Sequence, residues 1–213
     1  MLSLAINTAT SKSSFAIFDA NLKLLAEKSW PAKNNEAEKL LPEISKSLKK
    51  LKKNFTDISR VIAVRGPGSF TGLRVGVTVA NTIAHLNNAK LYAIDTFEYL
   101  WHARIPPWRE ECGSPPSPAL LLYAGRGGVY VSFNHENASK ATLINLPDLN
   151  SFLKKHKVKS AFGDISEEQK ATLKDINFLP GHNTFSETMS SFLQNPKLKS
   201  FTLVDPIYIK KPY

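Results

Sequence analysis

The sequence predicts an α/β protein of two lobes, in which a βββαβα plan occurs twice and the second copy is reduced. Three observations support this fold class. The chain has 213 residues, enough for two small lobes with buried cores. Short apolar runs alternate with stretches of helical periodicity. A pattern of strand, small-residue turn and strand occurs at residues 2–19 and returns at residues 119–135.

The first lobe is predicted to span residues 1–104. It opens with a three-stranded antiparallel meander, because three short apolar runs are separated by polar turns; these are residues 2–6, 14–19 and 22–28. A helix follows, since one apolar face recurs at helical spacing, formed by Leu40, Ile44, Leu48, Leu51 and Phe55. The rest of the lobe is predicted as strand 60–65, helix 69–86, strand 90–95 and helix 96–104.

A connecting loop and a smaller second lobe complete the chain. Residues 105–118 are rich in proline and lack periodicity, which predicts a loop. The C-terminal lobe, residues 119–213, is predicted to hold strands 119–123, 129–135, 141–146, 160–163 and 203–209 and helices 149–156, 166–173 and 184–194. By analogy of pattern, a duplicated plan of this kind is the architecture of the actin-like, sugar-kinase and Hsp70 superfamily, abbreviated ASKHA.

Composition narrows the class of protein. Lys+Arg 28 against Asp+Glu 18 gives a formal charge of +10, which permits an anionic partner such as nucleic acid or an acidic protein. A hydrophobic fraction of 42% and a charged fraction of 22% exclude disordered, collagen-like and coiled-coil classes. The single cysteine, Cys112, excludes an intramolecular disulfide framework and a multi-cysteine zinc site. We recognise no signal peptide or membrane helix, and therefore expect a cytoplasmic protein without membrane partners.

The most informative segment joins a buried strand to a helix, and consists of Arg65, Gly66, Pro67, Gly68, Ser69, Phe70, Thr71 and Gly72. Ser69 is a favourable N-cap for the helix. Within that helix small residues recur every four positions, at Gly72, Gly76, Ala80 and Ala84. Each glycine costs about 1 kcal/mol relative to alanine, so a close approach must offset it. The stripe predicts either a tight contact within the fold or a subunit interface formed with the helix at 40–51.

This segment, with the residues after it (RGPGSFTGLRVG), closely resembles the signature of the TsaB (YeaZ) family of bacterial tRNA threonylcarbamoyladenosine synthesis. Weaker similarities follow in family order at residues 4–10, 38–42, 91–96, 127–130 and 205–209. The resemblance implies a non-catalytic scaffold and activator, not an enzyme. Its implied partner is the paralogue TsaD, which carries the metal and transfers the threonylcarbamoyl group to adenosine 37 of tRNAs that read ANN codons.

The resemblance also implies further partners and an interface. A TsaE-like ATPase and, through the complex, tRNA are expected partners, and some family members self-associate through the same surface. ATP and metal are expected in the TsaD-like subunit, and no cofactor or metal in this chain. Pairing through the two helices of the first lobe implies an interface of Leu40, Leu41, Ile44, Leu48, Ser69, Phe70, Gly72, Leu73, Gly76, Ala80 and Ala84.

Departures from the family pattern support the non-catalytic interpretation. Asn7 replaces the family's opening aspartate, and an amide is a poor ligand for a hard cation. Tyr123 replaces a second aspartate, which leaves Asp164 as the remaining carboxylate of a degenerate nucleotide site. No histidine pair has the spacing of two ligands on one helix face. The segment also lacks the Gly-Lys-Ser/Thr of a phosphate-binding loop.

Two alternatives from other classes stay open. Fold analogy and Asp164 allow an independent ATPase, or a peptidase-like enzyme of the same superfamily. The charge of +10 allows a free-standing RNA-binding protein. Lysine clusters at residues 46–53, 154–159 and 210–211 are typical of a solvated face, but they could also contribute electrostatic attraction to tRNA.

Overall fold

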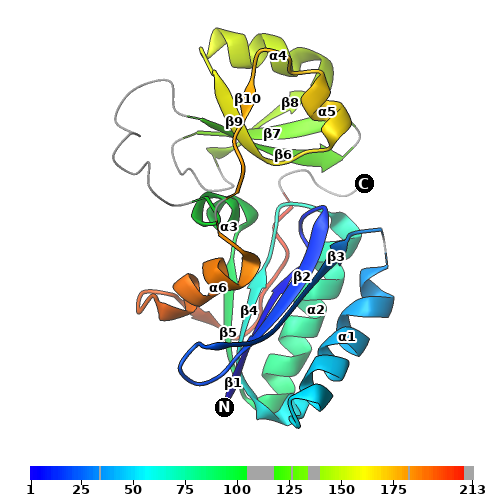
Figure 1. Ribbon diagram of the computed structural model, residues 1–213, viewed down its shortest axis with the longest axis vertical. Coiled ribbons are helices and arrows are strands. Elements are labelled where there is room, and N and C mark those ends of the chain that lie inside the picture. The colour runs from blue at the N-terminus through cyan, green and yellow to red at the C-terminus, as the bar shows by residue number, and fades with distance from the viewer. Residues whose placement is uncertain (34, 105–117, 126, 134–139, 182, 209–213) are drawn as a thin grey trace. The chain divides into compact units, whose positions relative to one another are not determined.

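The computed structural model describes residues 1–208 except 34, 105–117, 126, 134–139 and 182 (Figure 1). Within this range the chain forms two compact units. Unit 1 comprises Met1–Thr96 and Thr184–Tyr213, and unit 2 comprises Phe97–Asn183. This division differs from the predicted lobes, because the chain returns to the first unit at Thr184. The predicted loop at 105–118 lies almost wholly outside the described residues.

Unit 1 is built on a six-stranded sheet in the order β11-β5-β4-β1-β2-β3. Strands β1 (Leu2–Asn7), β2 (Lys12–Phe18) and β3 (Leu24–Pro31) form the predicted antiparallel meander. Strands β4 (Ile58–Val64) and β5 (Lys90–Ile94) run parallel to β1. The short β11 (Ser200–Phe201) pairs antiparallel with β5 at the other edge.

Helices cover both faces of this sheet. Helices α1 (Glu36–Lys50) and α2 (Phe70–Asn87) lie side by side on one face (Figure 1). Their apolar residues join Phe15 and Ile17 of β2 in a single buried cluster. Side chains of a strand alternate between faces, so α6 (Phe185–Gln194) covers the opposite face, where Ser186 Oγ donates to Glu27 of β3.

In unit 1 one predicted helix is confirmed except for its C-terminal end, and one predicted strand is wrong. The helix ends at Lys50, because Lys52 adopts a left-handed backbone with φ 55°, so Phe55 belongs to the short 3₁₀ turn η1 (Phe55–Asp57). The described residues 203–208 of the predicted closing strand form no strand. Instead the side-chain amide of Asn81 takes the place of a neighbouring strand: it accepts from Val204 N at 3.0 Å and donates to Val204 O at 2.9 Å.

Unit 2 holds a five-stranded sheet in the order β10-β9-β6-β7-β8. Strands β6 (Ala119–Gly125), β7 (Gly128–Ser132) and β8 (Thr142–Asn145) form the second meander, and β9 (Ser160–Asp164) runs parallel to β6. The two-residue β10 (Asn177–Phe178) was not predicted, because a segment of two residues has no recognisable periodicity. The repeat of the meander confirms the predicted duplication.

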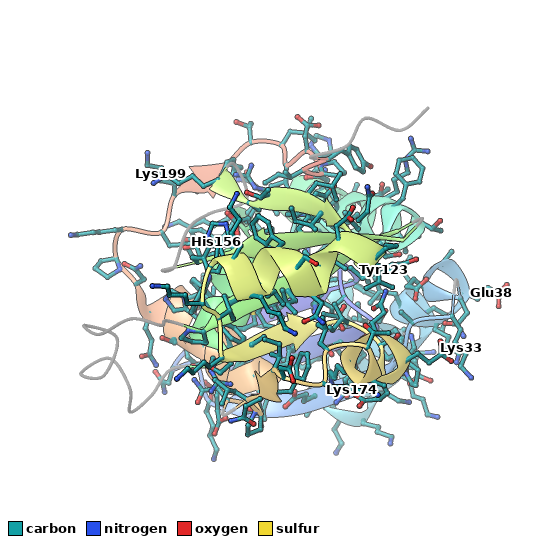
Figure 2. The ribbon with its side chains drawn as sticks, turned by 90° about the horizontal axis from the view of Figure 1, so that it is seen from above. Lys33, Glu38, Tyr123, His156, Lys174 and Lys199 are labelled. Atoms are coloured by element: carbon teal, nitrogen blue, oxygen red, sulfur yellow. The ribbon has the colours of Figure 1, made fainter. Side chains whose placement is uncertain are left out.

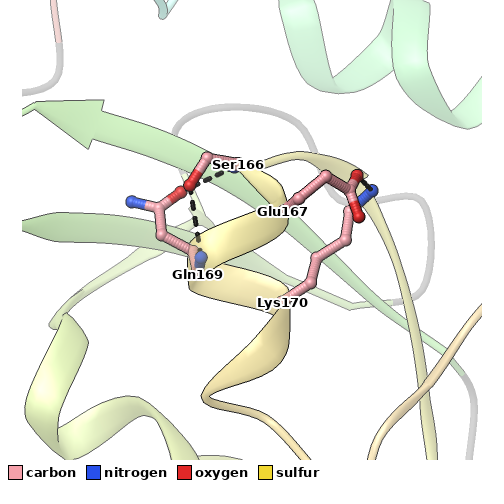
Figure 3. A network of polar contacts seen from close by, with 4 residues as sticks. All are labelled: Ser166, Glu167, Gln169 and Lys170. Carbon is pink, nitrogen blue, oxygen red and sulfur yellow. Dashed lines mark hydrogen bonds and ion pairs between the residues drawn. The ribbon is translucent and has the colours of Figure 1, made fainter.

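Three helices complete unit 2: α3 (Thr96–His102), which begins at the last residue of unit 1, α4 (Leu146–Lys155) and α5 (Glu167–Ala171). Leu149 and Leu153 of α4 are buried against the sheet. The predicted start of α5 is confirmed by a reciprocal cap, in which Ser166 N donates to Gln169 Oε1 and Ser166 Oγ accepts from Gln169 N (Figure 3).

Candidate functional site

The signature segment lies between β4 and α2 and is fastened to the turn between β1 and β2. Ser69 is the N-cap of α2, as predicted, and its hydroxyl accepts from Gly72 N at 3.2 Å. The backbone N–H of Ser69 donates to Ala9 O at 2.8 Å. The entry of α2 is therefore tied directly to residues 8–10, which lie far earlier in the sequence.

The glycines of this segment are required by that close approach. A Cβ atom built on Gly68 would lie 2.0 Å from Ala9 O, and one on Gly72 would lie 2.1 Å from Thr8 O. On Gly76 it would lie 2.1 Å from Thr8 Oγ1. The predicted close approach is confirmed, and of the two interpretations left open, the contact within the fold accounts for the glycine part of the stripe.

Burial limits what the predicted partner interface can present to a second protein. Eight of its eleven residues are buried inside unit 1, so their side chains are unavailable to a second protein in this conformation; they are Leu40, Ile44, Leu48, Gly72, Leu73, Gly76, Ala80 and Ala84. Ser69 is half-buried as the helix cap. Leu41 and Phe70 remain exposed, with accessible fractions of 43% and 40%.

An aromatic and cationic cluster surrounds the exposed Phe70. The Arg74 guanidinium lies over the Phe70 ring, 4.0 Å from its centroid, and the Tyr208 ring lies 5.3 Å away. Tyr208 is brought to α2 by the C-terminal segment, where Ile207 N donates to Arg65 O at 2.7 Å. Arg74 and Tyr208 lie in segments that resemble the family, but neither was predicted as an interface residue. Phe70 and Arg74 are spaced by one helical turn, and this spacing could have predicted that Arg74 lies beside Phe70.

Asn7 closes the turn on which the signature segment rests. Its side-chain oxygen accepts from Ala9 N at 2.9 Å, and its amide nitrogen donates to Thr10 Oγ1 at 2.8 Å. Thr10 Oγ1 in turn donates to Lys12 O at 3.0 Å, so it needs a donor at position 7. The residue is buried. An amide satisfies this environment, whereas an ionised carboxylate would face the lone pairs of Thr10.

We therefore predict that Asn7→Asp destabilises the protein by about 1–3 kcal/mol at neutral pH, because a buried hydrogen bond becomes a repulsive contact. Urea unfolding measures the change. The deficit should shrink on acidification toward pH 4, because a protonated carboxyl group at position 7 could again donate to Thr10. Asn21→Asp, on an exposed turn, is the matched control and should change stability by less than about 0.5 kcal/mol. An unaltered unfolding midpoint for Asn7→Asp would contradict this account of the turn.

The other two degenerate positions belong to unit 2. Tyr123 lies in β6 and is 43% exposed, and Asp164 ends the neighbouring β9, where it pairs in register with Leu122. Gly163 precedes Asp164 with φ 131°, and a Cβ there would lie 2.0 Å from Leu121 O. Among the described residues, no three His, Cys, Asp or Glu side chains are grouped so that they could hold a metal ion. Cys112 lies outside those residues.

Comparison with known proteins identifies the family. The family described as "TsaD: tRNA N6-adenosine threonylcarbamoyltransferase" matches residues 30–159, more than half of the chain. The chain belongs to this family. It is 30% identical over 100 residues to the tRNA threonylcarbamoyladenosine biosynthesis protein TsaB of Bacillus subtilis, covering 47% of this chain and 43% of that protein.

A second TsaB relative, from Buchnera aphidicola subsp. Schizaphis graminum, is 30% identical over 97 residues, 46% of this chain and 45% of that protein. The chain thus spans less than half the length of these curated relatives in the matched regions. Among solved structures, YeaZ from Pseudomonas aeruginosa is similar over 98% of this chain and 99% of its own, with a TM-score of 0.66 and 17% identity. A Listeria monocytogenes protein provisionally described as an N-acetylmannosamine kinase is 10% identical with a TM-score of 0.50, covering 90% and 97% of the two chains.

These structural similarities confirm the predicted fold class. The YeaZ and kinase-like structures share the two-lobed α/β architecture, and this chain has a mixed sheet in each unit. None of the described helices is long and apolar enough to cross a bilayer.

The positive charge of the chain is concentrated in unit 1. That unit holds 18 of the 28 Lys and Arg residues and 9 of the 18 Asp and Glu residues, a formal +9 of the total +10. None of the lysines at 46–53 forms an ion pair with a described acidic residue, whereas Lys154 of unit 2 pairs with Asp175 at 2.8 Å. Exposed lysines such as Lys33, Lys174 and Lys199 project outward (Figure 2). Lys210 and Lys211 lie outside the described residues.

Proposed function

We propose that this chain is a non-catalytic scaffold and activator of a TsaD-like enzyme in the formation of N6-threonylcarbamoyladenosine in tRNA. Family membership and the names of the TsaB relatives support a role in this modification. The main support for a non-catalytic role is the structure of the turn that contains Asn7. Both polar atoms of the Asn7 amide hold the backbone and Thr10, and the signature segment packs onto the same turn.

The donor set at the degenerate positions does not fit a nucleotide-bound divalent cation. Such a cation prefers carboxylate, carbonyl and water oxygens. The Asn7 oxygen already accepts from Ala9 N, and Tyr123 offers a phenol in place of a carboxylate. We therefore assign ATP and metal chemistry to the TsaD-like subunit, together with contacts to a TsaE-like ATPase and to tRNA made by the assembled complex.

The surface that we propose for the TsaD-like partner is what remains exposed of the predicted interface. Phe70 and Arg74 are exposed and form an aromatic and cationic group with the half-buried Tyr208, and Leu41 is exposed on the neighbouring helix α1. Aromatic and arginine side chains are the types enriched among residues that dominate binding energy at protein interfaces. The glycine stripe beneath them acts indirectly, because it fixes where α2 begins.

The test is pairing and modification with a purified TsaD-like subunit. The chain should raise threonylcarbamoyladenosine in a tRNA substrate, measured by mass spectrometry of nucleosides, and should form none alone. Phe70→Glu with Leu41→Glu should weaken pairing by at least about 2 kcal/mol, or roughly thirtyfold in Kd, because charges replace apolar contacts. Titration calorimetry measures it.

Leu86→Glu is the matched control, since Leu86 is 75% exposed in the last turn of the same helix. It should pair with unchanged affinity. Circular dichroism checks that all variants are folded. If Leu86→Glu weakened pairing equally, the proposed partner surface would be wrong. Hydrolysis of ATP or peptide by the purified chain alone would contradict the proposed non-catalytic role.

A further inference from the structure

The outer edge of β3 is one of the two edges of the six-stranded sheet in unit 1. β3 is the last strand of the six-stranded sheet, and no described strand pairs with its outer side. Of its eight residues only Trp30 is buried; the other seven, including the terminal Pro31, are partly or fully exposed. Proteins usually guard such edges with lysine or proline. Here the ammonium of Lys28 turns away to an ion pair with Glu43 of α1, which leaves most of the edge open.

The register shows which backbone groups point outward. Ala32 N donates to Ser11 O at 2.8 Å, so the pair of these residues is hydrogen-bonded. Hydrogen-bonded pairs alternate in an antiparallel ladder. Trp30 and Lys28, which face Ser13 and Phe15, therefore bond inward to β2. The N–H and C=O groups of Glu27 and Ser29 point to the open side.

A groove flanks β3 on each face of the sheet. On the α1 face the groove has a volume of about 360 Å³, and Ala26 and Lys28 of β3 lie opposite Lys46, Lys50 and Leu51. On the α6 face the groove has about 570 Å³, lined by apolar side chains of the hairpin and by hydroxyls of α6; these include Phe18, Leu22, Leu24, Ser186 and Ser190. A strand added to β3 would direct alternate side chains into the two grooves.

The α1 groove is positively charged. Lys46 and Lys50 have no ion-pair partner among the described residues, while Glu43 is engaged by Lys28, whose hydrogen bond holds the pKa of the Glu43 carboxyl below its usual value. Glu27 also lines this groove, but its carboxylate accepts from Ser186 on the α6 side. Lys46 and Lys50 are one helical turn apart, with Cβ atoms about 5–6 Å from each other. Alternate residues of a strand are about 6.6 Å apart, so consecutive acidic side chains on one face could reach both lysines.

We propose that the β3 edge binds an extended segment of a partner protein, which adds a strand to the sheet and alternates acidic with apolar side chains. The backbone bonds come from Glu27 and Ser29. Acidic side chains face Lys46 and Lys50, and apolar side chains enter the groove beside Leu24. This mode of recognition uses main-chain bonds for affinity and the side grooves for specificity. The site shares no residue with the surface proposed above for the TsaD-like subunit.

The probe is a fluorescein-labelled eight-residue peptide of alternating Glu and Val, with a Lys-Val peptide as its charge-reversed counterpart. Fluorescence anisotropy with the full chain should show binding of the first peptide and not of the second. Amide hydrogen exchange at Glu27 and Ser29 should slow when the peptide binds. Lys46→Glu with Lys50→Glu should lower the affinity at least tenfold, and Lys52→Glu, outside the groove lining, should leave it unchanged.

Ser29→Pro separates backbone pairing from charge attraction. It removes an outward N–H and leaves the inward bonds of Trp30 and Lys28, so it should lower the affinity at least tenfold, whereas Ser29→Ala should have no effect. If Ser29→Pro unfolds the chain, hydrogen exchange of the unmodified protein decides. The proposal is overturned by absence of binding at millimolar peptide, by equal binding of both peptides, or by binding without protection of the two amides. It is also overturned if single-stranded RNA competes through the lysines without such protection, or if a second copy of the chain protects the same amides.

Discussion

Replacing Gly72 with alanine is expected to destabilise the protein by about 2 kcal/mol or more, as overpacking does in a well-packed site. In an open helix the same replacement stabilises by about 1 kcal/mol, so the sign itself is informative. The added methyl group would lie 2.1 Å from Thr8 O. That carbonyl belongs to a turn held by both polar atoms of Asn7, so it cannot easily retreat. The unfolding midpoint in urea measures the change.

Gly76→Ala offers an internal comparison, because its methyl group would meet a side chain rather than the backbone. The nearest atom is Thr8 Oγ1 at 2.1 Å, an atom without a hydrogen-bond partner among the described residues. Thr8→Ala removes it. We expect Thr8→Ala to restore at least about 1 kcal/mol to Gly76→Ala and nothing to Gly72→Ala, and a double-mutant cycle measures this coupling.

The control for both variants is Gly181→Ala. A Cβ atom at Gly181 would meet no atom within 4 Å, and its backbone is not left-handed. This variant should therefore leave stability within about 0.5 kcal/mol of the parent. If Gly72→Ala were as stable as Gly181→Ala, the signature segment would not be locked to the turn, and the glycines would need another explanation.

The glycine stripe also marks how far the sequence could lead. Spacing of small residues every four positions predicts that something approaches α2 closely, since helix geometry is local. It does not say what approaches. The partner is Thr8, brought there by the parallel pairing of β1 with β4, which is a property of the whole sheet. An interface and an internal contact leave the same periodicity in the sequence.

Non-local hydrogen bonds account for the errors at the C-terminus. Residues 203–209 are mostly apolar, and from this we predicted a closing strand of the second lobe. In the structure Val204 is held by the side chain of Asn81 and Ile207 by the backbone of Arg65, both in unit 1. A single asparagine side chain 123 residues away satisfies the backbone in place of a ladder, and no periodicity encodes that.

At the degenerate nucleotide-site positions, the sequence predicts which chemical groups are missing, but not which hydrogen bonds the replacing residues form. The absence of a carboxylate at position 7 could be recognised from the family pattern. The requirement for a donor at that position became visible only with Thr10 Oγ1, which already gives its proton to Lys12 O. Exposure of Phe70 and Leu41, and burial of their neighbours, likewise depends on how α1 and α2 pack on the sheet.

Replacing Trp101 with alanine is expected to destabilise unit 2 by about 3–5 kcal/mol, the range for removal of a large buried aromatic side chain. Trp101 is almost fully buried, and its ring meets the edge of Phe162 of β9 with centroids 4.7 Å apart. The Arg104 guanidinium lies 5.0 Å from the centroid of the same Phe162 ring, and its Nη1 donates to Pro180 O at 2.7 Å. Burial lowers the pKa of Arg104, and loss of the tryptophan would leave this cation poorly packed.

Because these residues all lie in unit 2, the damage should be confined there. Amide hydrogen exchange should accelerate in β6 and β9 of the Trp101→Ala variant, while β1 and β4 of unit 1 keep their protection. Trp101→Phe, which retains an aromatic ring against Phe162, should lose less than half as much stability. Equal loss of protection in both sheets would mean that the two units unfold cooperatively, and that the packing of Trp101 on Phe162 stabilises the entire chain instead of the second unit alone.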